Sequence, residues 1–222
     1  DWPRAEQIAA AGTACFVLEE GDLRKIQVFS ELTNRCYALM ATVGAPTVLN
    51  AGIPMHRIKD VDPMADALQK IRAVAPVAGT VLDTATGLGY TAIRAARWAT
   101  EVTTIELDPA MLQLARLNPW SQALFDSPNI VEIVADSFHQ VRELGDHAFS
   151  RIIHDPPTFS MAGQLYSGEF YRQLHRVLKP NGRLFHYVGD LRSKRGRNLA
   201  RGVSRRLHEA GFEHVVRRPE AF

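Results

Sequence analysis

The segment 81–90, Val-Leu-Asp-Thr-Ala-Thr-Gly-Leu-Gly-Tyr, constrains the fold of this chain more than any other. It has the pattern of a short apolar strand that ends at Asp83, a turn that contains Gly87 and Gly89, and the start of a helix. Glycines let the backbone turn tightly after a strand and approach a ligand closely. The free N–H groups at the start of the helix then point toward that ligand. The segment therefore predicts a strand–turn–helix unit that binds a nucleotide-like cofactor.

The chain alternates apolar strands with helical stretches from residue 80 onward. After the first strand, further strands are expected at 102–107, 130–135, 151–154, 183–188 and 212–217. Helices are expected at 91–98, 109–117, 137–144, 168–178 and 198–210. This alternation is typical of βαβ units around a parallel sheet. We therefore predict an α/β fold in which residues 76–222 form a Rossmann-like sheet with helices on both faces.

Residues 1–75 differ from this pattern and are expected to form a small β-rich N-terminal module. The expected strands are a hairpin with a Glu-Gly-Asp turn over 16–28 and two short strands at 37–43 and 46–50. Asp62 and Pro63 then mark the start of a helix that extends to about Val74, because Asp is a favoured N-cap and Pro fits the first helical position. This helix links the module to the sheet.

The composition is that of a globular protein: 222 residues, 46% hydrophobic and 23% charged, with a net charge of +2. No apolar run approaches the about 18 residues of a membrane span, and no signal-peptide pattern is present. The two cysteines are too few for a disulfide framework, and the histidines show no zinc-type spacing. We therefore expect a cytoplasmic protein without a membrane partner or a metal. Because the sequence starts at Asp1 without a methionine and ends at Phe222, soon after an expected strand, we expect a fragment.

Acidic side chains stand at the ends of four expected strands: Asp83, Glu106, Asp136 and Asp155. Because ligands of an open parallel sheet bind beyond the carboxyl ends of its strands, these side chains are expected to converge on one crevice. Glu106 also lies close to the spacing from the glycine turn at which an acid receives ribose hydroxyls in dinucleotide-binding folds. The alternative interpretation is that each acid only caps the next helix. Four acids in series beside a glycine turn favour the shared crevice.

The segment Asp155-Pro156-Pro157-Thr158-Phe159 is the most informative one for chemistry. Two prolines fix the backbone and remove two N–H donors, which leaves the carbonyl groups free to accept hydrogen bonds. An acid and a rigid carbonyl can hold a nitrogen in line with a methyl donor, and methyl transfer is mainly a matter of such positioning. Phe159 can stack on a flat base. The alternative is an ordinary proline-rich turn.

A run of basic residues follows the expected fifth strand: Arg192, Lys194, Arg195, Arg197, Arg201, Arg205 and Arg206. The run begins at the sheet edge where the four acids are expected, which suits contacts with nucleic-acid phosphates. A solvated helix face is the alternative interpretation. His154 and His186, which lie within expected strands, are interpreted as packed rather than catalytic residues.

In their order, these motifs resemble the class I S-adenosylmethionine (SAM)-dependent methyltransferases over residues 80–218. The resemblance implies that the loop 83–89 holds the methionine part of SAM, Glu106 the ribose hydroxyls and Asp136 the adenine amino group. The further cofactor contacts that it implies are Asp83, Ala85, Thr86, Gly87, Gly89 and Tyr90 in the loop, Leu107 on the adenine, and Ser137 and Phe138. Ala85 and Tyr90 replace the outer glycines of the common acid-x-Gly-x-Gly-x-Gly form. NAD is the rival cofactor, but its fuller Gly-x-Gly-x-x-Gly motif is absent.

The segment from Asp155 to Phe159 is similar to the Asp-Pro-Pro-aromatic motif of N-methyltransferases that act on bases or on glutamine. Thr158 separates the second proline from the aromatic residue, in a form similar to that of some ribosomal-RNA methyltransferases. Together with residues 55–63, the segment also resembles predicted archaeal methyltransferases of unassigned substrate. That resemblance implies that four polar residues cover the cofactor or face the substrate, namely His56, Arg57, Lys59 and Asp60. A polar linker is the alternative.

These observations predict an enzyme that transfers a methyl group from SAM to a nitrogen, with an RNA base as the expected acceptor. An aminopropyltransferase similar to spermidine synthases is one alternative, since such enzymes also pair an N-terminal β module with this fold and use decarboxylated SAM. The basic run disfavours a polyamine acceptor. A methyltransferase of a protein or a small molecule is a second alternative. A non-catalytic SAM-sensing or RNA-binding subunit is a third.

Overall fold

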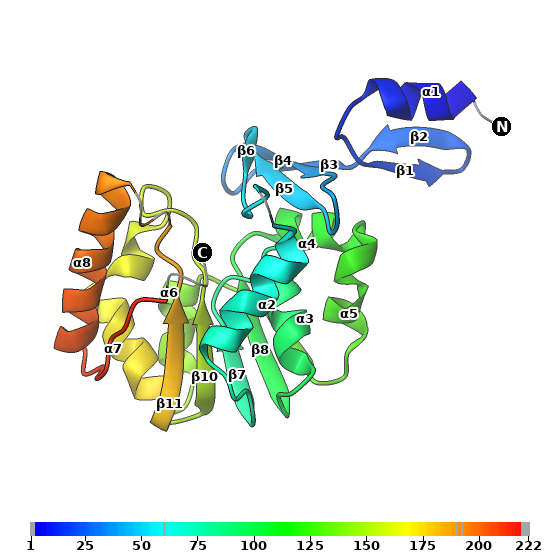
Figure 1. Ribbon diagram of the computed structural model, residues 1–222. Helices are drawn as coiled ribbons and strands as arrows, with labels where there is room; N and C mark the ends of the chain where they lie inside the picture. Colours follow the sequence, from blue (N-terminus) through cyan, green and yellow to red (C-terminus); the bar gives the residue numbers. More distant parts are fainter. Residues whose placement is uncertain (1–2, 60, 190, 192, 219–222) are drawn as a thin grey trace.

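A parallel five-stranded sheet forms the centre of the computed structural model, which describes residues 3–59, 61–189, 191 and 193–218. The strands lie in the order β11-β10-β7-β8-β9, and all neighbours are parallel (Figure 1). Their bounds are Thr80–Asp83 for β7, Glu101–Glu106 for β8, Ile130–Val134 for β9, Phe149–His154 for β10 and Leu178–His186 for β11. The strand order reverses between β7 and β10, which is where open α/β sheets bind ligands.

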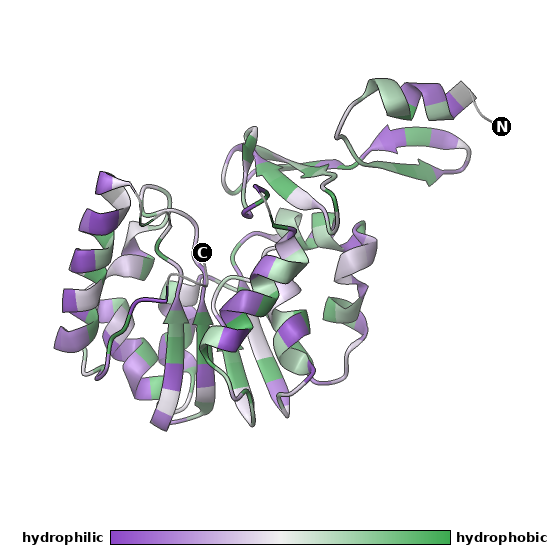
Figure 2. Ribbon diagram, in the orientation of Figure 1, coloured by the Kyte–Doolittle hydropathy of each residue, from purple (hydrophilic) through white to green (hydrophobic). Residues whose placement is uncertain are grey.

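Helices cover both faces of this sheet, which confirms the predicted fold class. One face is covered by α2 (Pro63–Ala73), α3 (Tyr90–Ala96) and α4 (Pro109–Arg116), and the other by α6 (Ser137–Glu143), α7 (Gly168–Val177) and α8 (Lys194–Glu209). Successive strand residues point to opposite faces, so Val81 belongs to one core cluster and Leu82 to the other. Figure 2 shows the apolar residues along the middle of the parallel strands.

Three short helices that the sequence does not predict lie in the connections. They are η1 (Pro119–Ser121), α5 (Gln122–Asp126) and η2 (Gly163–Tyr166). The predicted start of α2 is confirmed, because the Asp62 side chain accepts hydrogen bonds from the backbone of Met64 and Ala65. No helix in the described part of the chain is long and apolar enough to cross a membrane.

Two predictions near the C-terminus are wrong. β11 begins at Leu178, although the sequence predicts a helix that extends to residue 178 and a strand only from Arg183. The pairing of β11 with β10 shifts in register after Phe149, so an irregularity admits the extra residues into the strand. Residues 212–217 form no strand. Their apolar spacing instead packs Phe212 and Val215 against the core cluster of α7 and α8.

The N-terminal module consists of a helix and two antiparallel sheets. Its elements are α1 (Pro3–Ala10), the hairpin of β1 (Phe16–Glu19) and β2 (Asp22–Lys25), and a sheet of β3 (Gln27–Ser30), β4 (Arg35–Met40), β5 (Thr47–Asn50) and β6 (Ile53–Pro54). The predicted hairpin is confirmed, since Glu20 and Gly21 both have positive φ, as a two-residue turn requires. Val28 lies in β3 rather than in the hairpin.

Hydrogen bonds attach this module to the helices at the carboxyl edge of the parallel sheet (Figure 1). The Tyr37 hydroxyl of β4 donates to Asp108 Oδ2, just before α4, at 2.8 Å. The Tyr90 hydroxyl of α3 donates to the Pro46 carbonyl at 2.8 Å and accepts a bond from Asn118 Nδ2 at 2.8 Å. Both tyrosines are buried. The antiparallel sheet is therefore held beside the edge where a ligand is expected.

Candidate functional site

The two glycines of the loop after β7 serve different purposes. Gly87 has a φ of +55°, and a Cβ there would meet no atom within 4 Å, so its backbone borders open space. Gly89 has a φ of +77°, and a Cβ there would lie 2.7 Å from Leu124 Cδ2. Gly87 thus leaves room for a ligand, as the sequence predicts for both. Gly89 is required by the packing of α3 against α5.

Asp83 lies at the end of β7 and is fully buried. Its Oδ2 accepts hydrogen bonds from the hydroxyls of Thr91 at 2.8 Å and Thr104 at 3.2 Å. Burial raises the pKa of Asp83 to about 7; the Thr91 hydrogen bond opposes this rise, and the charge of Asp155 adds to it. The coupling of these two carboxyl groups fits the predicted shared crevice at the carboxyl ends of β7 and β10.

Glu106 lies at the end of β8, the strand next to β7. Its Oε2 accepts the N–H of Gly87 at 2.8 Å, and its Oε1 accepts the N–H of Asp108 at 3.0 Å. Burial raises the pKa of Glu106 against the lowering effect of these backbone donors. Each carboxylate oxygen has a second lone pair, so the group can still accept hydroxyl donors. The neighbouring Leu107 side chain is 46% exposed and offers an apolar surface.

Asp136 is the one member of the four acids that caps the helix following its strand. Its Oδ1 accepts the N–H of Phe138 at 2.9 Å at the start of α6. The helices that follow the other three strands are α3, α4 and η2, and none of them has a strand-end acid at its N-cap. The adjacent Ser137 hydroxyl donates to the Thr84 carbonyl at 2.6 Å, which ties this edge to the loop after β7. The Phe138 ring stacks on Phe170, with centroids 6.2 Å apart. The capping interpretation thus holds for Asp136 alone among the four.

Asp155 is paired with a buried lysine that the sequence does not single out. Lys70 Nζ, from α2, lies 2.5 Å from Asp155 Oδ2 and 2.8 Å from Asp66 Oδ2, and the Lys70 side chain is only 5% exposed. It also lies 4.9 Å from the centre of the Tyr187 ring, just after β11. Burial by itself lowers the pKa of Lys70, but Asp155 and Asp66 outweigh that effect and raise it. Lys70 therefore remains a cation between two acids.

The polar segment before α2 contributes to this same network. Arg57 Nη1 lies 3.3 Å from Asp66 Oδ1. The His56 ring lies 5.4 Å from that of Tyr90, and its Nδ1 is 2.9 Å from the Thr47 hydroxyl. Burial, with Lys70 nearby, lowers the pKa of His56 to about 4. Lys59 is exposed, and Asp60 lies outside the described residues. His56 and Arg57 thus contact residues of the same network, and their predicted role toward cofactor or substrate stays a prediction.

The loop after β10 presents a carbonyl and an aromatic ring. Tyr166 donates its hydroxyl to the Pro157 carbonyl at 2.9 Å, so this carbonyl is not free, contrary to the prediction. Among the described residues, none donates a hydrogen bond to the Pro156 carbonyl. The Phe159 ring is 47% exposed and meets Tyr166 edge-on at 5.5 Å. Asp155 and the Phe159 ring are therefore the partly exposed groups of this loop, whereas Pro156 is buried.

The histidines of β10 and β11 are packed, as the sequence predicts. His154 is fully buried, with Nδ1 2.6 Å from the Thr84 hydroxyl and Nε2 2.9 Å from the Leu165 carbonyl. The ring of His186 lies 4.3 Å from that of His154, and its Nε2 is 2.9 Å from the Tyr171 hydroxyl. Burial lowers the pKa of His154 to about 3 and lowers that of His186 well below its usual value.

The basic run lies mostly on α8, which begins a few residues after the carboxyl end of β11. Lys194, Arg197, Arg201 and Arg205 are exposed. Arg206 instead turns inward and donates to the Tyr166 carbonyl at 2.8 Å. Arg192 lies outside the described residues, and the Arg195 side chain is likewise not described. The described exposed members form a positive strip along one helix.

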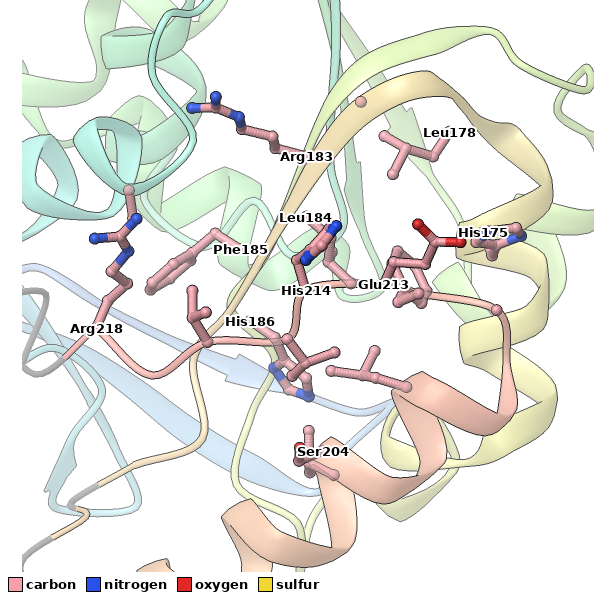
Figure 3. A pocket seen from close by; sticks show the side chains of 18 of the residues that line it. His175, Leu178, Arg183, Leu184, Phe185, His186, Ser204, Glu213, His214 and Arg218 are labelled. Carbon is pink, nitrogen blue, oxygen red and sulfur yellow. The ribbon is translucent and has the colours of Figure 1, made fainter.

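A large groove of about 990 Å³ lies between β11, α8 and residues 211–218 (Figure 3). Its lining includes Leu184, His186 and Ser204, and His175 and Glu213 also border it. None of the four strand-end acids lines this groove. It is therefore not the cofactor crevice that the sequence predicts at these acids.

The sequence analysis does not identify Asp66, Lys70 and Thr104 as site residues. For Asp66 and Lys70, however, the sequence contains a pattern that indicates a buried charge pair. Asp66 and Lys70 are charged residues four apart on α2 and lie next to the buried apolar residues Ala67 and Ile71. Charged residues on the apolar face of a helix are rarely buried without a partner. Thr104 carries no such signal, because β-branched residues are ordinary in strands.

The family model of a methyltransferase domain matches residues 81–182. The uncharacterized protein MJ1233 of Methanocaldococcus jannaschii is 47% identical over 208 residues, which cover 93% of this chain and 70% of that protein. Polyamine aminopropyltransferase 1 of Streptomyces coelicolor is 41% identical over 95 residues, which cover 40% of this chain and 18% of that protein.

The spermidine synthase from Thermotoga maritima has a similar structure, with a TM-score of 0.66 at 16% identity. The match covers 89% of this chain and 70% of that chain. At this level of identity the likeness shows the fold alone. Because the match covers 89% of this chain, the shared fold extends beyond the parallel sheet into the antiparallel N-terminal strands.

Proposed function

Because the chain belongs to the same family as the archaeal protein MJ1233 and contains a methyltransferase domain, we propose that it transfers a methyl group from SAM to a nitrogen of an RNA base. The observation that carries this proposal is that Asp155, whose side chain is 21% exposed, and the exposed Phe159 ring share the loop after β10, at the switch point of the sheet. These groups can bind an N–H group and a flat base at the same time.

The residues around the glycine loop fit SAM. The open backbone of Gly87 accommodates the methionine part, and Glu106 and Leu107 accommodate the ribose and the adenine. Asp136, which binds the N–H of Phe138 through Oδ1, would receive the adenine amino group. The side chain of Tyr90 is committed to Pro46 and Asn118, so a contact from this residue would come from its backbone.

Asp155 acts on the acceptor in this proposal. SAM supplies a methyl group on a positively charged sulfur, which leaves as a neutral thioether. Asp155 and the Pro156 carbonyl accept hydrogen bonds from the acceptor nitrogen and aim its lone pair at the methyl carbon. The N–C bond would form as the C–S bond breaks, and the extra proton of the acceptor nitrogen would pass to water. Positioning is the main contribution of these residues.

The strip on α8 supports RNA as the acceptor. The first turn of this helix contains basic residues and no acid, although cations at a helix N-terminus oppose the helix dipole. An unfavourable arrangement of this kind is explained if phosphates bind there. The strip starts after β11, close to the edge that holds the crevice.

Aminopropyl transfer is the second candidate, supported by the sequence likeness to polyamine aminopropyltransferases and the structural likeness to spermidine synthases. In that reaction a polyamine nitrogen would attack the aminopropyl group of decarboxylated SAM. A polyamine is a cation at neutral pH, whereas an RNA base is uncharged. The charges around Asp155 therefore help to decide between aminopropyl transfer and methyl transfer.

Methyl incorporation from labelled SAM into RNA tests the first proposal. We expect Asp155→Ala to lower the rate by about 100-fold or more, because it removes the group that orients the acceptor. SAM affinity should stay within a few-fold of the original. Glu169→Ala, which removes an exposed carboxylate on α7, is the matched control and should leave both quantities unchanged. Transfer to putrescine with decarboxylated SAM, but none to RNA, would replace methyl transfer by the second candidate.

A further inference from the structure

We infer that Lys70 sets the charge of the acceptor site, so that the site takes an uncharged nitrogen and rejects a cationic amine. The inference rests on the proposed function in one respect, namely that Asp155 faces the acceptor. It concerns a residue of α2 that the catalytic motif does not contain. Lys70 is a positioning and specificity-determining residue in this account, because it acts through Asp155.

The charges of the network balance. Asp155 and Asp66 are the two acids, and Lys70 and Arg57 are the two cations. Of the two cations, Lys70 contacts both acids: its Nζ lies 2.5 Å from Asp155 Oδ2 and 2.8 Å from Asp66 Oδ2. Asp66 is fully buried and the Lys70 side chain is 5% exposed, so solvent screens these pairs weakly. Asp155, whose side chain is 21% exposed, is the member at the carboxyl end of the parallel sheet, where the acceptor is proposed to bind.

This balance distinguishes two kinds of acceptor. A protonated polyamine nitrogen would have to approach Asp155 beside a cation that already occupies its Oδ2, and like charges in a poorly screened site repel strongly. An amino group of a base or an amide carries no charge and still donates an N–H to the carboxylate, which has lone pairs left on both oxygens. The site therefore suits uncharged acceptors.

A purely structural role for Lys70 would give a different outcome. Buried ion pairs contribute little net stability, because the cost of desolvating the charges offsets much of their attraction. If Lys70 only tied α2 to β10, its replacement would change stability without changing which amines bind. Amine binding is therefore the measurement that separates the two roles.

The test compares binding of the diamine putrescine to the SAM-loaded protein and to its variants. The original protein should bind putrescine weakly. Lys70→Met, which keeps most of the volume but no charge, should bind it at least about tenfold more tightly, because it leaves Asp155 uncompensated. Lys70→Arg retains the charge and should behave like the original. Arg72→Met removes an exposed cation from the same helix and is the matched control.

Two outcomes would overturn the inference: tight putrescine binding by the original protein, or no gain in the folded Lys70→Met variant. If Lys70→Met does not fold, the double variant Asp66→Asn with Lys70→Met removes one buried acid and one buried base together, and it carries the same prediction. Methyl transfer to RNA is measured separately. Its absence, alongside a gain of diamine binding, would reject the proposed function and leave the role of Lys70 intact.

Discussion

At the scale of single residues, the two glycines after β7 separate cofactor binding from folding. We expect Gly87→Ala to lower SAM affinity by about tenfold, because a methyl group enters the open space there, and to lower the unfolding free energy by about 1 kcal/mol because of its positive φ. Gly89→Ala should lower the unfolding free energy by about 2–4 kcal/mol, because strain at positive φ adds to the clash with Leu124. Calorimetric titration and denaturant unfolding measure the two effects.

The reverse assignment would contradict this account. If Gly89→Ala folded normally and failed to bind SAM, while Gly87→Ala bound SAM as before, the crevice would lie on the α5 side of the loop. Gly145→Ala is the control, because its Cβ also meets no atom within 4 Å and this glycine lies outside the site.

The site can be predicted from sequence where its residues follow strands, and not where they depend on tertiary packing. Asp83 and Asp155 can be placed together because parallel strands end at the same edge of a sheet. Lys70 cannot be placed beside Asp155 from the sequence, because its position depends on which face of α2 packs toward β10. The two prolines predict a free Pro157 carbonyl, but Tyr166, which occupies it, comes from a short helix without a sequence signal.

At the scale of elements, α8 carries the prediction on RNA. We expect the variant with Lys194→Gln and Arg201→Gln to bind RNA more weakly and to show a flatter salt dependence. The slope of log K against log salt should fall by about 0.7 for each phosphate that the variant no longer neutralises. SAM binding should not change. RNA binding measured at several salt concentrations provides both quantities.

Lys179→Gln is the control for this experiment. Lys179 is an exposed cation at the start of β11, at the opposite end of that strand from the crevice. Equal weakening in the control and in the α8 variant would mean that RNA senses only the overall charge. Unchanged RNA binding by the α8 variant would show that the strip is a solvated helix face.

Element boundaries are predictable where local chemistry sets them. Asp62 and Asp108 cap α2 and α4 through their own side chains, so the sequence contains what is needed. The start of β11 and the packing of residues 212–217 depend on neighbours distant in sequence, and the predictions for both are wrong. The division into residues 1–75 and 76–222 stays a prediction.

At the scale of the whole molecule, stability should rise between about pH 4 and pH 6.5. The unfolded chain gains protons below pH 6.5 on His56, His154 and His186, whose pKa values are lowered in the folded state. Asp83, Glu106 and Glu132 act in the opposite direction, because burial raises their folded pKa values and the folded protein keeps protons that the unfolded chain has released. Among these acids only Asp83 has a large shift, whereas all three histidines do, so the unfolding free energy increases with pH in this window.

His154→Gln tests this account of pH dependence. His154 binds a proton in the unfolded chain but not in the folded protein. Without this histidine, the slope of unfolding free energy against pH should fall by about 1.4 kcal/mol per pH unit below pH 6.5. The variant should also be less stable than the original protein at pH 7, since glutamine does not reproduce the fitted hydrogen bonds of the ring to Thr84 and Leu165. Denaturant unfolding at several pH values measures both. An unchanged slope would mean that His154 is protonated in the folded protein.

The proposed function requires that SAM binds at the carboxyl edge of the parallel sheet, and cofactor selection tests that claim most directly. The measurement is calorimetric titration of the purified protein with SAM, decarboxylated SAM and NAD. We expect SAM to bind most tightly, NAD to bind negligibly, and Gly87→Ala to weaken the SAM interaction. Preference for decarboxylated SAM would contradict methyl transfer in favour of aminopropyl transfer, and no binding by any of the three would contradict the cofactor site itself.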